Sequence, residues 1–537
     1  MGVSRPWPAS TDFLAAGVPG HPRRQRLTGH PTCCAIRDFG ATAGGGSARF
    51  QTTCEGFDTG SPSHYAEGMR KVTILALVAA IAAGCGGAKA TRPGTDSAEA
   101  WLSTTINGQK VGYSLYRFDA SPAGYRFESF IKMTIAMAGK TVQVQSRSVA
   151  NTASDLSLKD FSFTLSDQSA SGRVVGDELK MTVSGGKQER AIKLAGPIYP
   201  SSALGRLVVA RNLPKDSTIK VPVFDAAVLG VTPAEVKVLG REKVKAGGKE
   251  YDALKFTTRM AKIELTTWVD DKGAAIVEVS PPGIRSERTT QEQVLADEPE
   301  RARFDVLTMF RVPVDTAIPE GARVNHLKLE ITGVDTKMYS LTGPGQQVMS
   351  TSPLIVDIKM PDVPSGSLTL PVAGETAFLK PSVSVQSDAP EIKAKARAVL
   401  GGEKDATNAA RKLVSWAYQS VEKLATASLP NALDVLKTMK GDCNEHAVLL
   451  AALCRAAGIP TKIAVGLVYM NRAYYYHAWD EVFLGTWIPV DATFGEFPAS
   501  ALHLKLAEGE LSEQAEILGL VGTIGIKVRE FGLAPEE

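Results

Sequence analysis

The stretch MKGDCNEHAVLLAALCRAAGIP, from Met439 to Pro460, decides how the C-terminal part of this chain folds. Asp442 is a favourable N-cap residue, which predicts that a helix begins at Cys443. Apolar residues recur at intervals of three or four positions, and Gly458 followed by Pro460 predicts the end of the helix. A thiol therefore stands on the first turn of a helix that is otherwise built from core residues.

The first turn of a helix is a chemically distinct place for a thiol. Its backbone N–H groups and the helix macrodipole favour negative charge, so we expect the pKa of Cys443 to lie below the free value of about 8.5. The N–H of Cys443 is also a natural donor to an oxyanion. For a second oxyanion donor, Trp416 is the candidate that we name. This position suits a thiolate nucleophile.

Candidates for a base, and for a residue that orients it, follow in YYYHAWDEVFLGTWIPVDATFGEFP, residues 474–498. His477 lies in an alternating, aromatic segment that predicts a strand. Asp491 lies in the next short strand, after a turn at Gly485 and Thr486. A thiol nucleophile needs such a base within reach and a third group that holds the base in place.

Three motifs in this order resemble the transglutaminase-like superfamily, whose fold is related to that of papain-type cysteine proteases. They are GDCNEHA around Cys443, HAWDEVF from His477 and WIPVDATFG around Asp491, and the resemblance extends over about residues 385–505. It implies an α+β transglutaminase-like (papain-like) domain. In that domain Cys443 is the nucleophile, His477 is the general base and then acid, and Asp491 orients the imidazole.

The turn between the two strands decides whether Asp491 can reach His477. With a two-residue loop, Asp491 would point to the opposite side of the sheet from His477. A loop of three residues (484–486) or of five instead places Asp491 opposite Trp479 and diagonal to His477. We therefore predict an odd or bulged connection, with Gly485 as the bulge residue. If the loop were regular, the orienting group would have to come from the other acidic residues nearby: Asp480, Glu481 or Glu496.

Cys454 and His446 belong to the same predicted helix and raise two other interpretations. Cys454 lies eleven residues after Cys443. This is about 16 Å along the axis, beyond the reach of a disulfide, so we expect Cys454 to be buried and inert. A metal site of Cys443, His446, Cys454 and His477 would need side chains that cannot converge on one tetrahedral ion. No acidic loop of EF-hand type occurs in the sequence, and we expect no metal and no other cofactor.

Composition excludes several other classes of function. The chain has 537 residues, 44% of them hydrophobic, which indicates a globular protein with more than one domain. Its 60 basic and 57 acidic residues nearly balance, and no basic run is long enough to predict a nucleic-acid partner. The six cysteines are irregularly spaced and do not form a disulfide framework.

An internal start at Met69 changes how the N-terminus is interpreted. The sequence MRKVTILALVAAIAAGCGG has two cations, an apolar run from Val72 to Gly84 and small residues around Cys85. It resembles a bacterial lipoprotein signal, which implies that Cys85 becomes the lipidated first residue of the mature chain. The run is shorter than the roughly 20 residues of a membrane-spanning helix. We expect a lipid anchor in the bacterial envelope. Gly86 resembles the sorting pattern of lipoproteins in some bacteria, which implies the outer membrane, facing the periplasm.

The hydrophobic pattern divides the remaining chain. Alternating runs, beginning with a hairpin signal at Asn107 and Gly108, predict an antiparallel all-β domain and then a second β-rich segment. Asp388 as an N-cap and Pro390 in the first turn mark the change to a mixed α and β pattern. A chain that begins at about Pro381 is expected to fold alone. The predicted divisions are a misread, disordered upstream extension at 1–68, a signal peptide at 69–84, a linker at 85–100, the all-β domain at 101–300, the second β-rich segment at 301–385, the catalytic domain at 386–510 and a C-terminal tail at 511–537.

The favoured function is that of an envelope lipoprotein whose C-terminal domain performs acyl transfer at an amide carbonyl of a protein or peptide. The thiolate attacks, an acyl-enzyme forms, and water or an amine resolves it. Hydrolysis, as in a peptidase or amidase, is favoured because water is always present and the sequence offers no dedicated amine pocket. The alternatives are a protein-crosslinking transglutaminase and a catalytically inactive binding or scaffold lipoprotein.

Overall fold

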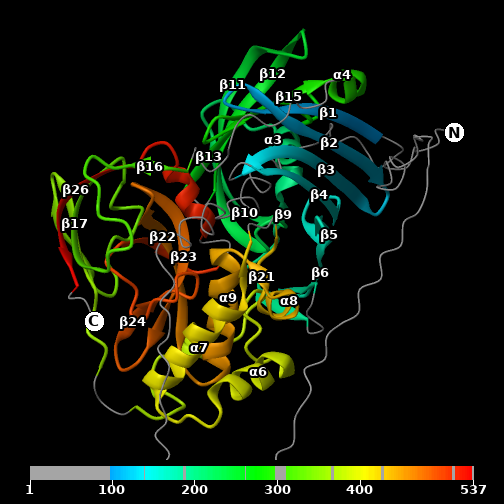
Figure 1. The fold of residues 1–537 in the computed structure, drawn as a ribbon. Helices are drawn as coiled ribbons and strands as arrows, with labels where there is room; N and C mark the ends of the chain where they lie inside the picture. Colours follow the sequence, from blue (N-terminus) through cyan, green and yellow to red (C-terminus); the bar gives the residue numbers. More distant parts are fainter. Residues whose placement is uncertain are drawn as a thin grey trace, which may run out of the picture. The chain divides into compact units, whose positions relative to one another are not determined.

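The computed structural model describes residues 97–137, 140–184, 189–260, 262–296, 310–364, 368–424, 428–510 and 514–534 (Figure 1). The predicted upstream extension, the signal peptide and the lipidation site Cys85 lie outside these described residues. Among the helices within them, none is both long enough and apolar enough to cross a bilayer.

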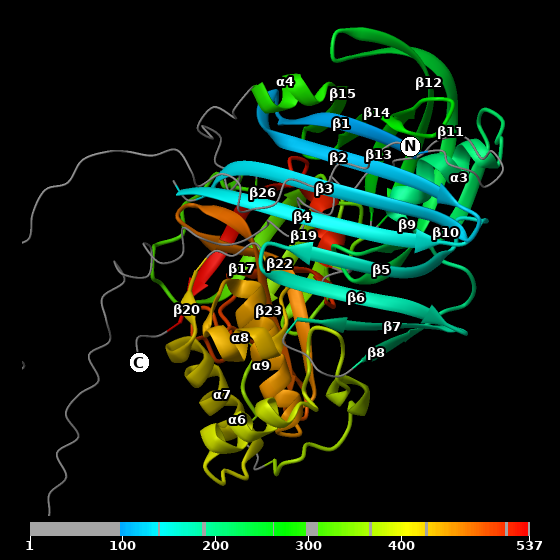
Figure 2. The same cartoon turned by 90° about the vertical axis from the view of Figure 1, so that its right-hand side faces the viewer.

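The N-terminal part folds into one fifteen-stranded sheet, and Figure 2 shows its first eight strands side by side. The order is β8-β7-β6-β5-β4-β3-β2-β1-β15-β14-β13-β12-β11-β10-β9, so β1 and β15 join the two halves of the sheet. The strands are β1 (Ser97–Ile106), β2 (Gln109–Ser121), β3 (Gly124–Met137), β4 (Lys140–Thr152), β5 (Leu158–Leu165), β6 (Gln168–Val175), β7 (Glu178–Val183), β8 (Arg190–Lys193), β9 (Tyr199–Pro200), β10 (Thr218–Asp225), β11 (Gly230–Ala246), β12 (Lys249–Met260), β13 (Ile263–Val269), β14 (Ala275–Ser280) and β15 (Ile284–Thr289).

Period-two alternation accounts for these strands. In β5 the side chains of Phe161, Phe163 and Leu165 are buried while the residues between them are exposed. The predicted hairpin at Asn107 and Gly108 is present: both residues have positive φ, of 49° and 80°, and they connect β1 to β2. The neighbouring strands of this sheet pair antiparallel, except that β9 and β10 pair parallel. The prediction of an antiparallel β region is confirmed, although β1 begins inside the expected linker.

A second, four-stranded sheet has the order β18-β19-β17-β26. Its strands are β17 (Val324–Thr332), β18 (Gln346–Thr351), β19 (Leu354–Lys359) and β26 (Gly525–Leu533). The expectation that 511–537 is a tail therefore needs correction. Leu329 pairs with Val528, and both are buried, so the end of the chain completes a sheet that starts about 200 positions earlier.

The C-terminal part combines helices with a third sheet. In Figure 1, α9 lies beside β22 and β23, and α6, α7 and α8 gather around α9. The helices are α6 (Pro390–Leu400), α7 (Ala406–Ser420), α8 (Ala432–Thr438) and α9 (Cys443–Ala456), and the strands are β16 (Val312–Pro313), β22 (Thr461–Met470), β23 (Ala473–Phe483), β24 (Trp487–Val490) and β25 (His503–Glu508). Shorter elements are α3 (Leu204–Ala210), α4 (Gln291–Ala296), β20 (Glu422–Lys423) and β21 (Lys440–Gly441). This is the predicted α+β fold, which is confirmed.

Two local expectations about this region need correction. Asp388 was expected to cap α6, but Ala389 occupies the N-cap position and the Asp388 carboxylate accepts a hydrogen bond from Arg190 at 2.9 Å. A chain beginning near Pro381 would also lose β16, which pairs with β23, and the sheet that contains β17. The structure therefore argues against independent folding from that point, because an edge strand and part of the core would be missing.

Candidate active site

The helix that carries the candidate nucleophile starts as predicted. Cys443 is the first residue of α9, and Asp442 is its N-cap. The Asp442 side chain accepts the N–H of Asn444 at 2.8 Å, and the Glu445 side chain accepts the N–H of Asp442 at 3.0 Å, which completes a capping box. These bonds fix the first turn and leave the N–H of Cys443 to point out of the helix start, as an oxyanion donor requires.

The thiol itself differs from the expectation. The Cys443 residue is only 2% exposed. Burial raises the pKa of the Cys443 thiol well above its usual value, the Asp442 carboxylate adds to the rise, and the backbone N–H of Ala478 opposes it. The expected lowering of this pKa by the helix N-terminus is therefore wrong for the closed site, because desolvation of a thiolate outweighs the favourable dipole. Cys443 rests as a neutral thiol and needs a base.

The register of β23 and β24 brings the base and the orienting residue together. Phe483 pairs with Trp487, and Asp480 pairs with Val490, so the connection is the three-residue loop 484–486. Gly485 has a φ of 83°, as expected for the bulge residue of such a loop. The predicted odd connection is confirmed, and its consequence is that residue 491 falls on the same side as residue 477.

His477 and Asp491 form a buried hydrogen bond. The Nε2 atom of His477 lies 2.6 Å from Oδ2 of Asp491, and neither side chain is exposed. The other carboxylate oxygen accepts the N–H groups of Thr493 at 2.6 Å and Phe494 at 3.2 Å. Burial alone would raise the pKa of Asp491, but the adjacent His477 and, after it, His503 lower the pKa well below its usual range. Asp491 is thus a fixed carboxylate.

The hydrogen bond also selects the reactive nitrogen of His477. Because the Asp491 carboxylate can only accept, Nε2 of His477 carries a proton. Its Nδ1 atom is buried and has no hydrogen-bond partner among the described residues. The next residue in β23, Ala478, presents its N–H to the Cys443 thiol. Nδ1 is therefore the ring nitrogen of His477 that is left without a hydrogen-bond partner among the described residues.

Sequence reasoning missed one residue of this cluster, His503. Its Nε2 atom lies 2.9 Å from the same Asp491 oxygen that His477 contacts, and its Nδ1 atom lies 3.1 Å from the carbonyl oxygen of Ser500. Trp479 lies against both imidazoles, with ring centroids 6.2 Å from His477 and 5.2 Å from His503. The short strand HLKLAE carries no motif, so only the pairing of β25 with β22 could have identified His503.

The ligand atoms of His477, Asp491 and His503 lie within 4.8 Å of one another, so a metal ion has to be considered. Around a tetrahedral zinc ion, ligand atoms stand about 3.3 Å apart, given metal–ligand bonds of about 2.0 Å. The observed nitrogen–oxygen distances of 2.6 and 2.9 Å are those of direct hydrogen bonds. We therefore describe this group as a hydrogen-bonded cluster.

The other candidates take no part in this cluster. Cys443 and Cys454 are free thiols, and burial raises the pKa of Cys454, as expected for an inert core thiol. His446 contacts the carbonyl oxygen of Asp442 at 2.6 Å through Nδ1, which is a bond within its own helix turn. The Trp416 ring lies 5.1 Å from the ammonium group of Lys395 in α6, and no contact of it with Cys443 is found within the described residues.

Two of the alternative orienting groups are engaged elsewhere. Glu481 binds the ammonium group of Lys505 at 2.8 Å, and Glu496 accepts the N–H of Ser500 at 2.6 Å. Asp480 is fully buried, burial raises its pKa well above the usual value, and neither of its carboxyl oxygens has a hydrogen-bond partner among the described residues. Asp491 therefore remains the one candidate that contacts His477.

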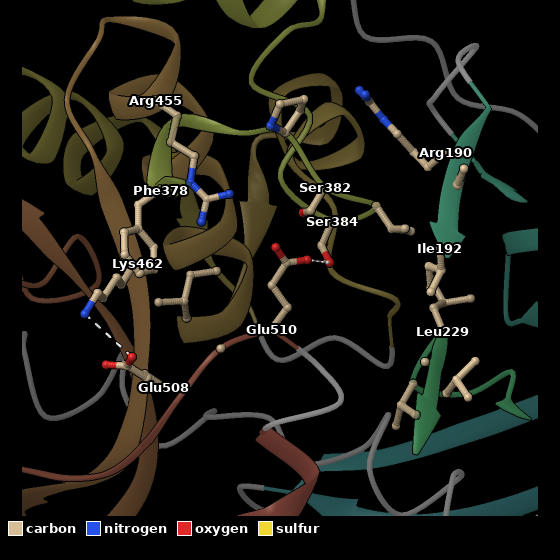
Figure 3. A pocket seen from close by; sticks show the side chains of 18 of the residues that line it. Arg190, Ile192, Leu229, Phe378, Ser382, Ser384, Arg455, Lys462, Glu508 and Glu510 are labelled. Carbon is tan, nitrogen blue, oxygen red and sulfur yellow. Dashed lines mark hydrogen bonds and ion pairs between the residues drawn. The ribbon is translucent and has the colours of Figure 1, made fainter. Parts of the chain in front are cut away.

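A cavity of about 870 Å³ lies at the other end of α9 (Figure 3). Arg455 in the last turn of α9 lines it, together with groups that already bind one another: Glu510 accepts from Ser384 at 2.6 Å, and Lys462 lies 3.6 Å from Glu508. Within the described residues, the cluster around His477 does not contribute to its wall. This cavity is separate from the candidate active site.

Comparison with protein families agrees with this division of the chain. Residues 393–492 match the family described as Transglutaminase-like superfamily, which confirms the predicted resemblance for this region. Residues 94–280 match a family described as Protein of unknown function (DUF3108). A comparison with curated proteins found no match.

Three solved structures have similar parts. One, described as a proposed cysteine protease from Cytophaga hutchinsonii, is 20% identical over 40% of this chain and 86% of that chain, with a TM-score of 0.27. The β-barrel-like DUF1849 protein from Brucella abortus is 13% identical over 37% of this chain and 98% of that chain, with a TM-score of 0.31. The periplasmic domain of TgpA from Pseudomonas aeruginosa, bound to ethylmercury, is 17% identical over 35% of this chain and 90% of that chain, with a TM-score of 0.23.

Proposed function

We propose that the transglutaminase-like region at residues 393–492 is a cysteine enzyme that transfers the acyl group of a protein or peptide amide, by way of Cys443, to water. One observation carries this proposal. Asp491 holds Nε2 of His477 at 2.6 Å, and this leaves Nδ1 without a partner beside the strand residue that contacts the thiol. These contacts support Cys443 as nucleophile, His477 as base and Asp491 as orienting group.

The first half of the reaction forms the acyl-enzyme. Nδ1 of His477 takes the proton of the Cys443 thiol while sulfur bonds to the amide carbon, and the π electrons of the carbonyl move to its oxygen. The N–H of Cys443 stabilises that oxyanion. When the carbonyl re-forms, the carbon–nitrogen bond breaks, and His477 gives its proton to the leaving amine. During these steps the buried Asp491 carboxylate accepts the Nε2–H of His477 and keeps the ring in place.

The second half returns the enzyme to its resting state. His477 removes a proton from a water molecule, whose oxygen bonds to the thioester carbon. The carbon–sulfur bond then breaks, and the sulfur regains the proton from His477. An amine in place of water would give a crosslink by the same steps. Hydrolysis is favoured because water needs no binding site of its own.

A non-catalytic binding or scaffold role is the second candidate function. The 2% exposure of Cys443 and the raised pKa of its thiol favour it, since a buried neutral thiol is unreactive until the site opens. In the catalytic interpretation, substrate binding has to displace the groups that cover Cys443. The two candidates therefore differ in whether the thiol can be acylated at all.

Acylation by p-nitrophenyl acetate separates the candidates, because this small ester needs no specific recognition. The full chain is incubated with the ester, and peptide mass spectrometry locates the acetyl groups. We expect transient acetylation of Cys443 in the native chain and in the matched control Cys454→Ala, and none at that peptide in Cys443→Ala. Equal, slow acetylation of both cysteines would support the scaffold role. Unfolded casein with dansylcadaverine then distinguishes hydrolysis, which gives new peptide ends, from transfer, which gives labelled casein.

We also propose that the chain works in the bacterial envelope, anchored by lipid on Cys85 and facing the periplasm from the outer membrane. The cationic start at Met69, the apolar run and the small residues around Cys85 support this proposal. A periplasmic location would give the enzyme access to protein and peptide amides of the envelope.

A further inference from the structure

The ring of His503 meets a hydrogen-bond acceptor at each nitrogen. Nδ1 lies 3.1 Å from the carbonyl oxygen of Ser500, which can only accept. Nε2 lies 2.9 Å from Oδ2 of Asp491, a carboxylate that already accepts N–H groups at its other oxygen. A neutral imidazole has one N–H and would leave one of these contacts without a proton. Both contacts are satisfied when the ring carries two protons.

The surroundings of His503 favour this charged form. Its side chain is 3% exposed, and a buried cation needs a partner of opposite charge. Burial alone would lower the pKa of His503, but the Asp491 hydrogen bond and the charge of Glu496 raise it above its usual value. Two carboxylates near the ring, Asp491 and Glu496, come from the segment after β24, and Glu496 lies 4.0 Å from Nδ1 of His503. The third titratable group near the ring is His477 from β23, whose ring centroid lies 5.7 Å from that of His503. The strand β22 presents the apolar Val468 opposite His503, and Lys505 farther along β25 binds Glu481 and Glu508.

We propose that His503 is a positioning residue: as an imidazolium it shares the Asp491 carboxylate with His477 and keeps His477 in the neutral form that can accept the thiol proton. This inference rests on the proposed function of His477 as the base. A carboxylate paired with His477 alone would favour a second proton on that ring, and a protonated ring is no base. The charge of His503 offsets the charge of Asp491, so His477 faces a pair that is neutral overall.

The shared oxygen also fixes the His477 ring. Two N–H donors at 2.6 and 2.9 Å approach Oδ2 of Asp491 from two different strands, β23 and β25. The backbone N–H groups of Thr493 and Phe494 hold the other oxygen. The carboxylate therefore has no freedom to rotate away from His477, and the tautomer with a free Nδ1 is maintained.

Ring nitrogen chemical shifts test the charge directly. The full chain is labelled with ¹⁵N-histidine, and the two-proton and one-proton forms of each ring are distinguished between about pH 5 and pH 9, the range in which histidine charge changes. We expect both ring nitrogens of His503 to carry protons at pH 7 in the native chain. A neutral His503 at pH 7, with the proton on Asp491 instead, overturns the proposal.

Variants then test the effect on His477. His503→Gln keeps an N–H donor near Asp491 but removes the charge, and His503→Leu removes both. In each variant, the pH at which the His477 ring takes up its second proton should rise by about one unit, because a like charge less than 6 Å away has been removed. The matched control is His326→Gln, which removes a histidine paired with Asp357 in another sheet. The proposal fails if His477 titrates in His503→Gln as it does in the control.

The outcomes separate this inference from the proposed function. Histidine titrations need no thiol chemistry. A shifted titration of His477 together with an unreactive Cys443 would therefore leave the charge assignment of His503 in place and refute the proposed enzymatic function. Conversely, acylation of Cys443 together with an unchanged titration of His477 in His503→Gln would support the proposed function and overturn the role of His503. The pH dependence of the acylation rate provides a third measurement. The pH below which this rate falls should rise in His503→Gln together with the pH at which His477 takes up its second proton.

Discussion

Asp491 follows His477 by fourteen residues, yet its carboxylate receives the Nε2–H of His477 at 2.6 Å. The relationship depends on the count of residues in one loop. Because 484–486 form the connection, residue 491 continues the same face of the sheet as residue 477. One residue fewer would turn the carboxylate to the other face, and no hydrogen bond to His477 could form.

The loop count can be tested with two changes at one position. Deleting Gly485 shortens the loop to two residues and should reverse the face of Asp491, so we expect acylation of Cys443 to fall by about 100-fold or more, as for loss of an oriented base. Gly485→Ala keeps the count. It strains a residue with a φ of 83° and should cost about 1 kcal/mol of stability with acylation largely retained. Acylation that survives the deletion would contradict this account.

Removing the carboxylate should damage both catalysis and stability. In Asp491→Ala the buried His503 loses its counter-charge and His477 loses its partner, and we expect a loss of about 3–5 kcal/mol in the free energy of unfolding, as for a broken buried ion pair. Asp491→Asn keeps one hydrogen-bond acceptor, so its free energy of unfolding should fall less than that of Asp491→Ala. Urea unfolding of both variants measures the difference. A stability loss for Asp491→Ala that is no larger than that for an exposed residue would count against the buried network.

The thiol predictions concern His477 as well as Cys443. Because burial raises the pKa of Cys443, rapid alkylation by iodoacetamide depends on His477 as a base. His477→Ala should slow alkylation of Cys443 by about 100-fold, whereas Cys454→Ala should leave it unchanged. Tandem mass spectrometry, which assigns the label to Cys443 or to Cys454 within their common tryptic peptide, gives the rates. If His477→Ala is alkylated as fast as the native chain, His477 is not the base.

The positions of Cys443, His477 and Asp491 were predictable because the information is local. The start of α9 follows from Asp442 and its capping chemistry, and the position of Asp491 follows from alternation and one loop length. The β region was predictable for the same reason, since its strands pair mainly with neighbours in sequence. Each of these features needs only a few consecutive residues.

The features that were missed depend on distant contacts. His503 joins the site because β25 pairs with β22, and the end of the chain joins a sheet because Val528 pairs with Leu329. The raised pKa of Cys443 is a consequence of burial, and helix position alone does not reveal how much of a turn is covered. Tertiary packing, and not local propensity, decides these properties.

The proposed anchor is tested by changing the residue that would carry it. Cys85→Ser removes the sulfur that would be lipidated, so the chain should move from the membrane fraction to the soluble fraction. Cys454→Ala serves as the control, since its thiol is buried in the core and should not affect fractionation. Metabolic labelling with a fatty acid should mark the native chain and not Cys85→Ser. Membrane retention of an unlabelled Cys85→Ser chain would exclude this anchor.

The pH dependence of stability provides a test of His503 that requires no activity. The folded protein raises the pKa of His503, with burial opposing and the Asp491 hydrogen bond outweighing it, whereas a histidine in an unfolded chain titrates near 6.5. Such a group contributes stability that is fully present below about pH 6.5 and is lost as the pH rises through the folded value. The pKa of Asp491 is lowered, so its own contribution is lost only as the pH falls below about 4.

Urea unfolding at about pH 5.5, 7 and 8.5 therefore isolates the histidine. The native chain should have a larger free energy of unfolding than His503→Gln, and this difference should be greatest at the lowest of these pH values. The difference should shrink by about 1 kcal/mol as the pH rises. The double variant Asp491→Asn with His503→Gln should differ from Asp491→Asn by an amount that no longer shrinks as the pH rises, because the charged partner is gone and burial alone lowers the pKa of His503. A difference that grows with pH would mean that His503 is neutral in the folded protein, and Asp491 would then hold His477 alone.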